Sequence, residues 1–427
     1  MRKPLLIAVC AALTSFVAAQ DRPQVPPDSQ TFLDAQLHAL PPLSPARARR
    51  VRSLVAQMTL KEKVGQMTQL EVGMITDGSE GSVRVNPEKL RKAVVDYGVG
   101  SILNVKDIAL PPAKWHEIIG AIERATGQTR LHVPVIYGLD SVHGANYVAG
   151  ATIFPQQLGL AATWDYELAR EAAAITAAET RSAGVPWNFS PVLDVGRQPL
   201  WPRLYETFGE DPYLVSVMGA AVIRGYQGDD PSSPTRVAAT LKHYIGYSVP
   251  VSGHDRTPAM IPEMMLRQTL LPPFAAGVKA GALTVMVNSG EVNGIPGHVN
   301  RYLLNDVLRG ELGFDGVIVS DWEDIKKLVY LHHTAANEKD ATRAAVLAGI
   351  DMSMVPSDYS FSDLLVKLVT EGAVPIARID DAVTRILTLK ARVGLLDPPS
   401  SAPAVTTTVG SPASRQEIGR ASCRERV

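Results

Sequence analysis

The sequence predicts an α/β fold, a (β/α)8 barrel of the TIM type, and three observations support this prediction. Short apolar runs alternate with helical patterns over about 350 residues, which favours a single parallel α/β domain. About eight such units occur, which favours a closed barrel over an open doubly wound sheet. No glycine-rich phosphate-binding loop follows any predicted strand, which argues against a nucleotide-binding sheet.

The individual elements follow from local signals along the chain. Thr59 and Glu62 form a capping box, Asp165 is a good N-cap, and Gly313 closes the third of three helices. These helices are expected to run from Thr59 through Met67, over 166–183 and over 303–312. Strands are expected at 100–103, 133–137, 188–193, 238–242, 283–287, 317–319 and 349–352.

The N-terminal part has the composition of an exported protein. Arg2 and Lys3 precede a short apolar stretch and a small-residue site at 17–19, which predicts a cleaved signal peptide over residues 1–19. We therefore expect a periplasmic or secreted protein. Residues 20–50 form a Pro-rich segment, and residues 51–396 contain the predicted barrel.

The C-terminal part differs from the barrel in composition. Residues 397–416 are rich in Pro, Ser, Thr and Ala, and we expect a truncated interdomain linker there. Residues 417–427 read EIGRASCRERV, which is also the translation of a common sequencing-adapter sequence. We expect read-through and exclude this tail from the fold prediction; a short disordered basic tail is the alternative. The natural chain is then expected to continue beyond Gln416.

Charge and cysteine content narrow the possible functions. Both cysteines, Cys10 and Cys423, lie in the predicted signal and tail, so disulfides, thiolate metal sites and cysteine nucleophiles are excluded from the mature domain. The formal charge of −1 becomes about −4 without the signal and the tail. We therefore expect neither nucleic acid nor membranes as partners.

The segment 316–322, GVIVSDW, is the most informative part of the chain. Three successive β-branched residues indicate a strand that is buried on both faces. An acid directly after such a strand is costly to bury unless it is hydrogen-bonded or used, and barrel enzymes carry their chemistry at the carboxyl ends of the strands. Asp321 is therefore a candidate catalytic residue. The alternative is a structural carboxylate that caps the next helix or binds a buried arginine.

Four more predicted strands lead into polar residues: Asp140 and His143; Asp194, Arg197 and Arg203; Lys242 and His243; Asn288 and Glu291. At one end of a barrel these residues predict a polar pocket. The set suits a sugar, because carboxylates accept hydrogen bonds from hydroxyls, cations donate to them, and Trp322 offers a flat apolar face. The alternatives are a buried ion network without a ligand, and a Trp322 that only packs in the core. Histidine spacing predicts no metal, no cofactor is expected, and no Gly-x-Ser-x-Gly elbow occurs.

Several motifs resemble glycoside hydrolase family 3, of the β-glucosidase and exo-β-glucanase type, over about Val51 to Val393. These motifs are VPVIYGLDSVHG at 133–144, GATIFPQQLG at 150–159, ETFGEDP at 206–212, the Lys242-His243 pair and VIVSDW at 317–322. The resemblance implies that Asp321 is the nucleophile of retaining β-glucoside hydrolysis. It also implies that Asp140, Arg203, Lys242 and His243 bind the terminal glucose, with Trp322 packed beside it.

The resemblance also implies what this chain lacks. In the family an α/β sandwich domain follows the barrel and usually supplies the acid/base glutamate, which cannot be assigned here, so the fragment is expected to be impaired. Three places depart from the family pattern: Pro202 replaces a glycine, Ser289 replaces an aromatic residue of some relatives, and His254-Asp255 differ from the Asp-His dyad of N-acetylglucosaminidases.

Other functions stay open from the sequence. They are a β-xylosidase or another exo-glycosidase of the family, a non-catalytic sugar-binding barrel, and a lyase with a Schiff base on Lys242. Linkage, aglycone and oligomeric state are not predicted.

Overall fold

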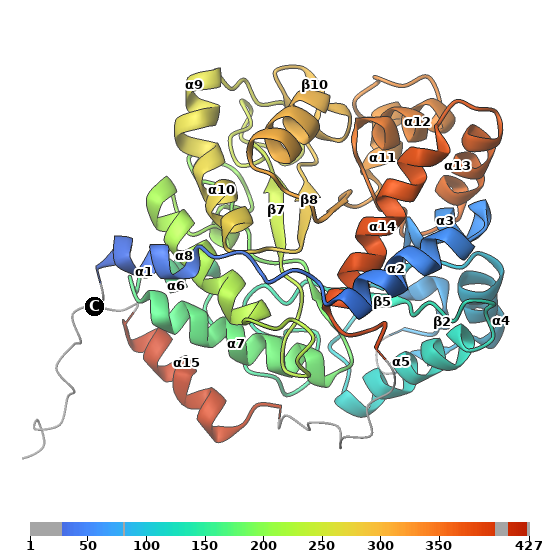
Figure 1. Cartoon of the computed structure of the whole chain (residues 1–427). Coiled ribbons are helices and arrows are strands. Elements are labelled where there is room, and N and C mark those ends of the chain that lie inside the picture. Colours follow the sequence, from blue (N-terminus) through green and yellow to red (C-terminus); the bar gives the residue numbers. More distant parts are fainter. Residues whose placement is uncertain (1–27, 80–81, 398–408, 425–427) are drawn as a thin grey trace, which may run out of the picture.

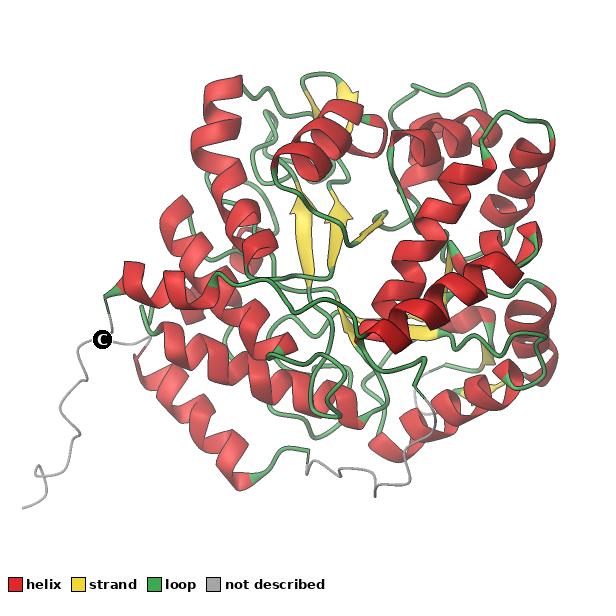
Figure 2. Cartoon of the chain, viewed as in Figure 1, coloured by secondary structure: helices red, strands yellow, loops and turns green. Residues whose placement is uncertain are grey.

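The computed structural model describes residues 28–79, 82–397 and 409–424, and in it parallel strands lie inside a layer of helices (Figures 1 and 2). The predicted signal peptide lies outside the described residues, as do parts of the predicted Pro-rich segment and linker. The predicted parallel α/β fold is confirmed.

Eight short strands form two parallel sheets. One sheet has the order β12-β1-β4-β5-β6 and the other the order β11-β8-β7. Isolated parallel bridges join Trp187 to Ala238 and Val319 to Met352, so the two sheets also meet at their edges. The carboxyl ends of these strands therefore face one side. The strands are β1 (Thr68–Glu71), β4 (Ser101–Leu103), β5 (Ile136–Leu139), β6 (Trp187–Asn188), β7 (Thr240–Tyr244), β8 (Thr284–Val287), β11 (Val317–Val319) and β12 (Ser353–Met354).

Several of these strands differ from the prediction. β5 lies at 136–139 where 133–137 was predicted, and β6 covers only 187–188 where 188–193 was predicted. β1 was not predicted, because its sequence TQLE lacks an apolar run; Gln69 is nevertheless buried, and its amide donates to Ser101 Oγ at 2.8 Å. β12 begins at Ser353, just after the predicted segment 349–352, and that segment contacts β11 through an isolated bridge at Met352 and hydrogen bonds to Ile318.

The predicted helices lie where the local signals place them. The capping box is present at the start of α3 (Leu60–Gln66), where Thr59 N donates to Glu62 Oε2 at 2.8 Å. Asp165 caps α7 (Tyr166–Ser182) by accepting from Leu168 N at 2.9 Å. The third helix, η7 (Tyr302–Glu311), has the wider π-type hydrogen bonding, which the sequence pattern does not distinguish from an α-helix.

The remaining elements complete the outer layer. Two antiparallel pairs project from it, β2 (Thr76–Asp77) with β3 (Arg84–Val85) and β9 (Glu291–Val292) with β10 (Ile295–Pro296). The other helices are α1 (Ser29–Gln36), α2 (Pro45–Gln57), η1 (Val72–Met74), α4 (Pro87–Leu90), η3 (Arg91–Asp96), α5 (Pro112–Thr126), α6 (Gln157–Ala161), η4 (Leu204–Glu206), α8 (Pro212–Gln227), α9 (Glu263–Met265), η5 (Leu266–Leu270), α10 (Leu271–Lys279), η6 (Gly297–Val299), α11 (Asp324–Tyr330), α12 (Glu338–Ala348), α13 (Ser360–Thr370), α14 (Ile376–Arg392) and α15 (Pro412–Arg424).

A buried carboxylate fixes β11 within the sheet. Asp351 is fully buried, and its Oδ2 accepts from Ile318 N at 2.9 Å and from Arg309 Nη2 at 2.7 Å. Its Oδ1 accepts from Arg378 Nη2 at 2.8 Å. This ion cluster holds the strand that leads into Asp321, because Ile318 is the middle residue of β11.

The helix α15 crosses the predicted boundary between linker and tail. It lies against α7, where Arg420 pairs with Glu171 at 3.0 Å (Figure 1). Just before α15, Gly410 N donates to the buried Glu179 at 2.8 Å. The boundaries at 397 and 417 stay predictions.

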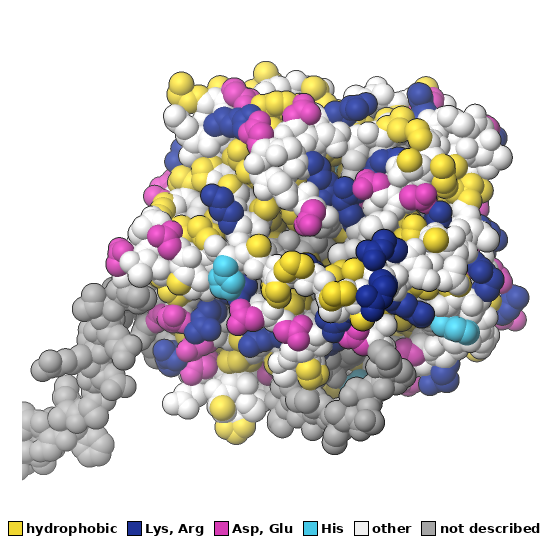
Figure 3. All heavy atoms as spheres, viewed as in Figure 1, with side chains coloured by type: hydrophobic (Ala, Val, Ile, Leu, Met, Phe, Trp, Pro, Cys, Tyr) yellow, Lys and Arg dark blue, Asp and Glu magenta, His cyan; other side chains and the backbone are white. Residues whose placement is uncertain are grey.

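The visible surface carries both signs of charge (Figure 3). Basic side chains gather over α2, where Arg49, Arg50 and Arg52 are exposed; we did not predict this group. Among the described residues no helix combines the length and the apolar character that a bilayer crossing requires.

Candidate active site

The carboxyl ends of the strands surround a cavity of about 320 Å³. The predicted site residues all line it: Asp140, Arg203, Lys242, His243, Asp321 and Trp322. His143 also lines the cavity. Four other predicted polar residues do not line it. Asp194 accepts from His243 N at 2.9 Å, and Asn288 Nδ2 donates to Ile245 O at 2.9 Å. Arg197 donates to Glu210 O at 3.2 Å, and Glu291 pairs with His332 at 2.8 Å.

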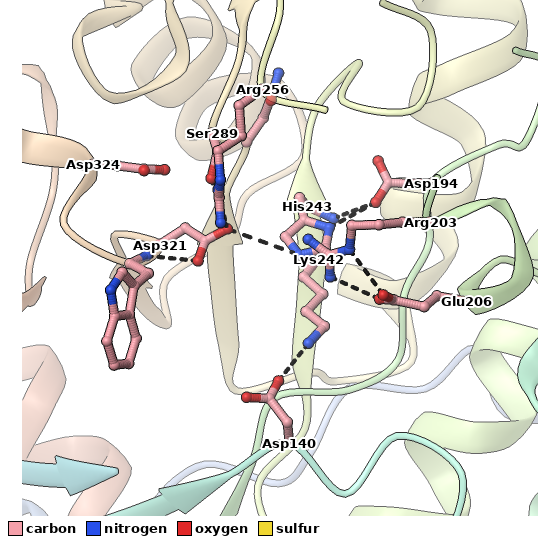
Figure 4. Close-up of polar contacts among 12 residues, drawn as sticks. Asp140, Asp194, Arg203, Glu206, Lys242, His243, Arg256, Ser289, Asp321 and Asp324 are labelled. Carbon is pink, nitrogen blue, oxygen red and sulfur yellow. Dashed lines mark hydrogen bonds and ion pairs between the residues drawn. The ribbon is translucent and has the colours of Figure 1, made fainter. Parts of the chain in front are cut away.

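Asp321 follows β11 and points into the cavity (Figure 4). The residue is only 8% exposed. Its Oδ2 accepts from Ser289 Oγ at 2.7 Å and its Oδ1 accepts from Trp322 N at 2.6 Å. Its backbone N–H donates to Nε2 of the buried His298 at 3.2 Å. Both carboxylate oxygens therefore have a fixed orientation before any ligand binds.

The surroundings of Asp321 keep its carboxylate ionised. Burial alone would raise the pKa of Asp321. Electrostatic interactions with the neighbouring His243, Arg256 and Arg203 and the hydrogen bond from Ser289 outweigh burial and hold the pKa of Asp321 well below its usual range. An ionised, oriented carboxylate in a cavity is suited to act as a nucleophile.

Lys242 and Asp140 form a pair across the cavity. Lys242 Nζ donates to Asp140 Oδ1 at 2.6 Å, and the side chains are 4% and 30% exposed (Figure 4). The ammonium is thus almost removed from water, while the carboxylate keeps an open side for hydroxyl groups.

A bulge in β7 lets two consecutive residues line the cavity. In a regular strand Lys242 and His243 would point to opposite faces. The pairing of β7 with β8 shifts by one residue between Leu241 and Tyr244, which is the interval that contains both residues. Such bulges redirect side chains next to active sites.

Asp194 orients His243. Its Oδ2 accepts from His243 N at 2.9 Å and faces His243 Nδ1 at 2.8 Å (Figure 4). Burial lowers the pKa of His243 well below its usual value and raises the pKa of Asp194 to about 7. We assign the Nδ1–H to the hydrogen bond with Asp194, which leaves Nε2 as an acceptor toward the cavity, 4.0 Å from Asp321 Oδ2.

Arg203 is held by a carboxylate that we did not predict as its partner. Arg203 Nε and Nη2 donate to the two oxygens of Glu206 at 2.9 and 2.7 Å. Burial opposes ionisation of Glu206, but the hydrogen bond from Arg203 and its charge lower the pKa of Glu206. Glu206 opens the ETFGEDP motif and stands three residues after Arg203, which was the available signal.

Two further residues beside Asp321 were not predicted as site residues. Ser289 follows β8, and Arg256 lies on the loop after β7, with its Nη1 at 3.9 Å from Asp321 Oδ2. Loop residues carry no periodic pattern, so the sequence offered no signal for Arg256.

Within the described part of the chain, no three His, Cys, Asp or Glu side chains are placed to hold a metal ion.

The chain is similar to known proteins named as beta-glucosidases. A lysosomal beta glucosidase of Dictyostelium discoideum is 47% identical over 399 residues, which is 90% of this chain and 48% of that protein. A periplasmic beta-glucosidase of Salmonella typhimurium is 35% identical over 374 residues, 87% of this chain and 46% of that protein. The chain thus spans about half the length of these curated relatives.

A solved structure gives the same result. The beta-glucosidase of Listeria innocua in complex with glucose superimposes with a TM-score of 0.78 at 33% identity, over 88% of this chain and 51% of that one. The family model described as the glycosyl hydrolase family 3 N terminal domain matches residues 59–389. This chain therefore belongs to glycosyl hydrolase family 3.

Proposed function

We propose that the protein is a retaining, exo-acting β-glucosidase that removes terminal non-reducing β-D-glucosyl residues. The observation that carries the proposal is Asp321, an oriented and ionised carboxylate that faces Asp140, Lys242, His243 and Arg203 across one cavity. The relatives named above as beta-glucosidases, one of them with glucose bound, support the substrate class.

The first step forms a bond between Asp321 and the anomeric carbon while the glycosidic C–O bond breaks. The leaving oxygen takes a proton from a general acid. Water then loses a proton to the conjugate base of that acid and attacks the anomeric carbon, while the bond between this carbon and Asp321 breaks and the sugar is released. Asp140 and His243 Nε2 would accept hydrogen bonds from sugar hydroxyls, Lys242 and Arg203 would donate to them, and Trp322 would pack on the ring.

The general acid is proposed to come from outside the described cavity. Glu206 is ionised by its pair with Arg203, and Asp140 is paired with Lys242. A glutamate of a C-terminal domain, as the family resemblance implies, is the proposed donor.

We further propose that the two sheets form one closed eight-stranded barrel, which the bridges at 187–238 and 319–352 support. Export through a signal peptide at 1–19 is also a proposal.

A trapping experiment tests the assignment of Asp321. Incubation with 2,4-dinitrophenyl 2-deoxy-2-fluoro-β-D-glucoside should leave one 2-fluoroglucosyl group on the protein, because this leaving group needs no general acid. Peptide mass spectrometry should locate the label on Asp321, and Asp321→Asn should remain unlabelled. A label on Asp140 or Glu206 would contradict the proposal. The matching 2-fluoroxyloside distinguishes the alternative, a β-xylosidase, which should be labelled faster by that reagent.

A further inference from the structure

One nitrogen atom beside the proposed nucleophile has no hydrogen-bond partner. Arg256 Nη1 is buried and unpaired among the residues that the structure describes, and it lies 3.9 Å from Asp321 Oδ2. A buried donor that is left unpaired is costly. Arg256 lines the cavity, so a ligand bound there can supply the acceptor for this atom.

The loop holds Arg256 in this position. Arg256 has φ of 57°, in the left-handed region that non-glycine residues rarely adopt. The neighbouring Asp255 accepts from Trp201 Nε1 at 3.2 Å, and Val251 N donates to Pro258 O at 3.0 Å across the loop. On the other edge of the guanidinium, Nε is 3.8 Å from Asp255 Oδ2. The guanidinium therefore reaches the cavity from an anchored loop.

The distance between Arg256 and Asp321 fits one oxygen atom. At 3.9 Å the two groups are too far apart for a direct hydrogen bond. An oxygen at about 2.8 Å from each atom fits between them. A hydroxyl there accepts from Arg256 Nη1 and donates to Asp321 Oδ2. Ser289 occupies only one position on that oxygen, which can accept a second hydrogen bond.

Sugar geometry identifies this hydroxyl. When Asp321 faces the anomeric carbon, the closest hydroxyl is the one on the adjacent carbon, C2. We propose that Arg256 binds the C2 hydroxyl of the glycosyl unit and selects substrates that carry it. This inference rests on the proposed function. Hydrogen bonds to this hydroxyl strengthen in the transition state of retaining hydrolysis, so Arg256 is expected to affect turnover as well as binding.

Paired substrates test this role. We would measure kcat/KM of the full chain for 2,4-dinitrophenyl β-D-glucopyranoside, whose leaving group needs no general acid, and for its 2-deoxy analogue, both corrected for spontaneous hydrolysis. Arg256→Met should lower kcat/KM for the glucoside by about 10- to 100-fold, as expected for a lost charged hydrogen bond. The loss for the 2-deoxy analogue should be less than about threefold. Arg256→Lys, which keeps the charge without the planar fork, should shrink the preference for the glucoside only in part.

A matched variant separates binding at C2 from a general defect. Asp140→Asn, on the opposite side of the cavity, should lower kcat/KM for both substrates by the same factor. Equal losses for both substrates in Arg256→Met would contradict the role of Arg256 and leave the proposed function standing. If Arg256→Met does not fold by circular dichroism, an unchanged preference in Arg256→Lys would contradict it. Hydrolysis of neither substrate by the unmodified chain would contradict both proposals.

Discussion

Ser289 Oγ donates a hydrogen bond of 2.7 Å to Asp321 Oδ2, and the two residues follow the neighbouring parallel strands β8 and β11. The position of one strand relative to the other thus determines the orientation of the proposed nucleophile. The hydrogen bond from Ser289 favours the ionised form of Asp321.

Removal of this hydrogen bond should raise the pKa of Asp321. With an activated leaving group, the acid limb of the glycosylation rate that reflects Asp321 should lie below about pH 4 in the unmodified protein. Ser289→Ala should move this limb upward and lower the rate at pH 6 by about tenfold. Ser216→Ala, on α8, removes a hydroxyl that donates to Pro212 O at 2.6 Å and should change neither value. An unchanged limb in Ser289→Ala would show that Ser289 does not act on Asp321.

Asp194→Asn should remove a pH dependence near neutrality. Above about pH 7 the ionised Asp194 accepts the Nδ1–H of His243 and fixes the tautomer that presents Nε2 to the cavity. Glucose should therefore inhibit the unmodified protein more strongly above pH 7 than below it. The Asp194→Asn variant should bind glucose weakly and without this step. A step of the same size in the variant would assign it to another group.

The same substitution has an expected effect on stability. Burial raises the pKa of Asp194 in the folded chain to about 7, above its value of about 3.9 in the unfolded chain. The folded state therefore binds more protons between these pH values, and stability falls as the pH rises from about 4 to 7. The Asp194→Asn variant should lack this fall. Urea unfolding at pH 4.5 and pH 7.5 measures it.

Asp140 should stabilise the fold by neutralising Lys242. Asp140→Asn leaves a nearly buried ammonium without its carboxylate, which should cost about 1–3 kcal/mol in the free energy of unfolding. Lys242→Met should cost less, and the double variant should cost less than the sum of both. Urea unfolding measures these values. Glu167→Gln breaks an exposed pair with Arg170 and should cost under about 0.5 kcal/mol. Additive costs for Asp140 and Lys242 would show that the two are not coupled.

Lys390 should make stability increase in alkaline solution. The side chain is fully buried on α14, where Nζ donates to Gln66 Oε1 and Pro134 O, each at 2.6 Å. Burial lowers its pKa to about 7, while the unfolded chain keeps a value near 10.4. The unfolded state therefore binds the additional proton between these values, so stability rises with pH from about 7 to 10.

A comparison of variants isolates this effect. Between pH 7 and pH 9, the unmodified protein should gain about 1–3 kcal/mol relative to Lys390→Met. The exposed Lys367, replaced by Met in the same way, should give no such difference. A constant difference between the unmodified protein and Lys390→Met across this range would mean that Lys390 is charged in the folded chain.

Strong local patterns made most of the fold and the central site predictable. The run 317–319 located both β11 and Asp321, because three adjacent β-branched residues favour a strand that is buried on both faces. Asp165 and Thr59 marked helix starts through hydrogen bonds within one turn. β1 was missed because its polar residues are satisfied by partners distant in sequence, such as Ser101.

The rest of the site depends on tertiary structure. Whether Lys242 and His243 line the same cavity is decided by the bulge against β8, which no pattern in β7 reveals. Asp194 was visible at the end of a strand, but its role as partner of His243 needs the approach of two segments 49 residues apart. Arg256 reaches Asp321 only through the path of a loop.

The ion cluster around Asp351 holds the strand that leads into Asp321, and it is separate from the loops that border the cavity. Three arginines lie within ion-pair distance of this carboxylate, and none of them belongs to those loops. They are Arg309, Arg378 and Arg385. Exchange of the loops that border the cavity is therefore expected to leave the anchoring of β11 unchanged. Variants with different loops around the cavity can therefore be compared on the same arrangement of strands.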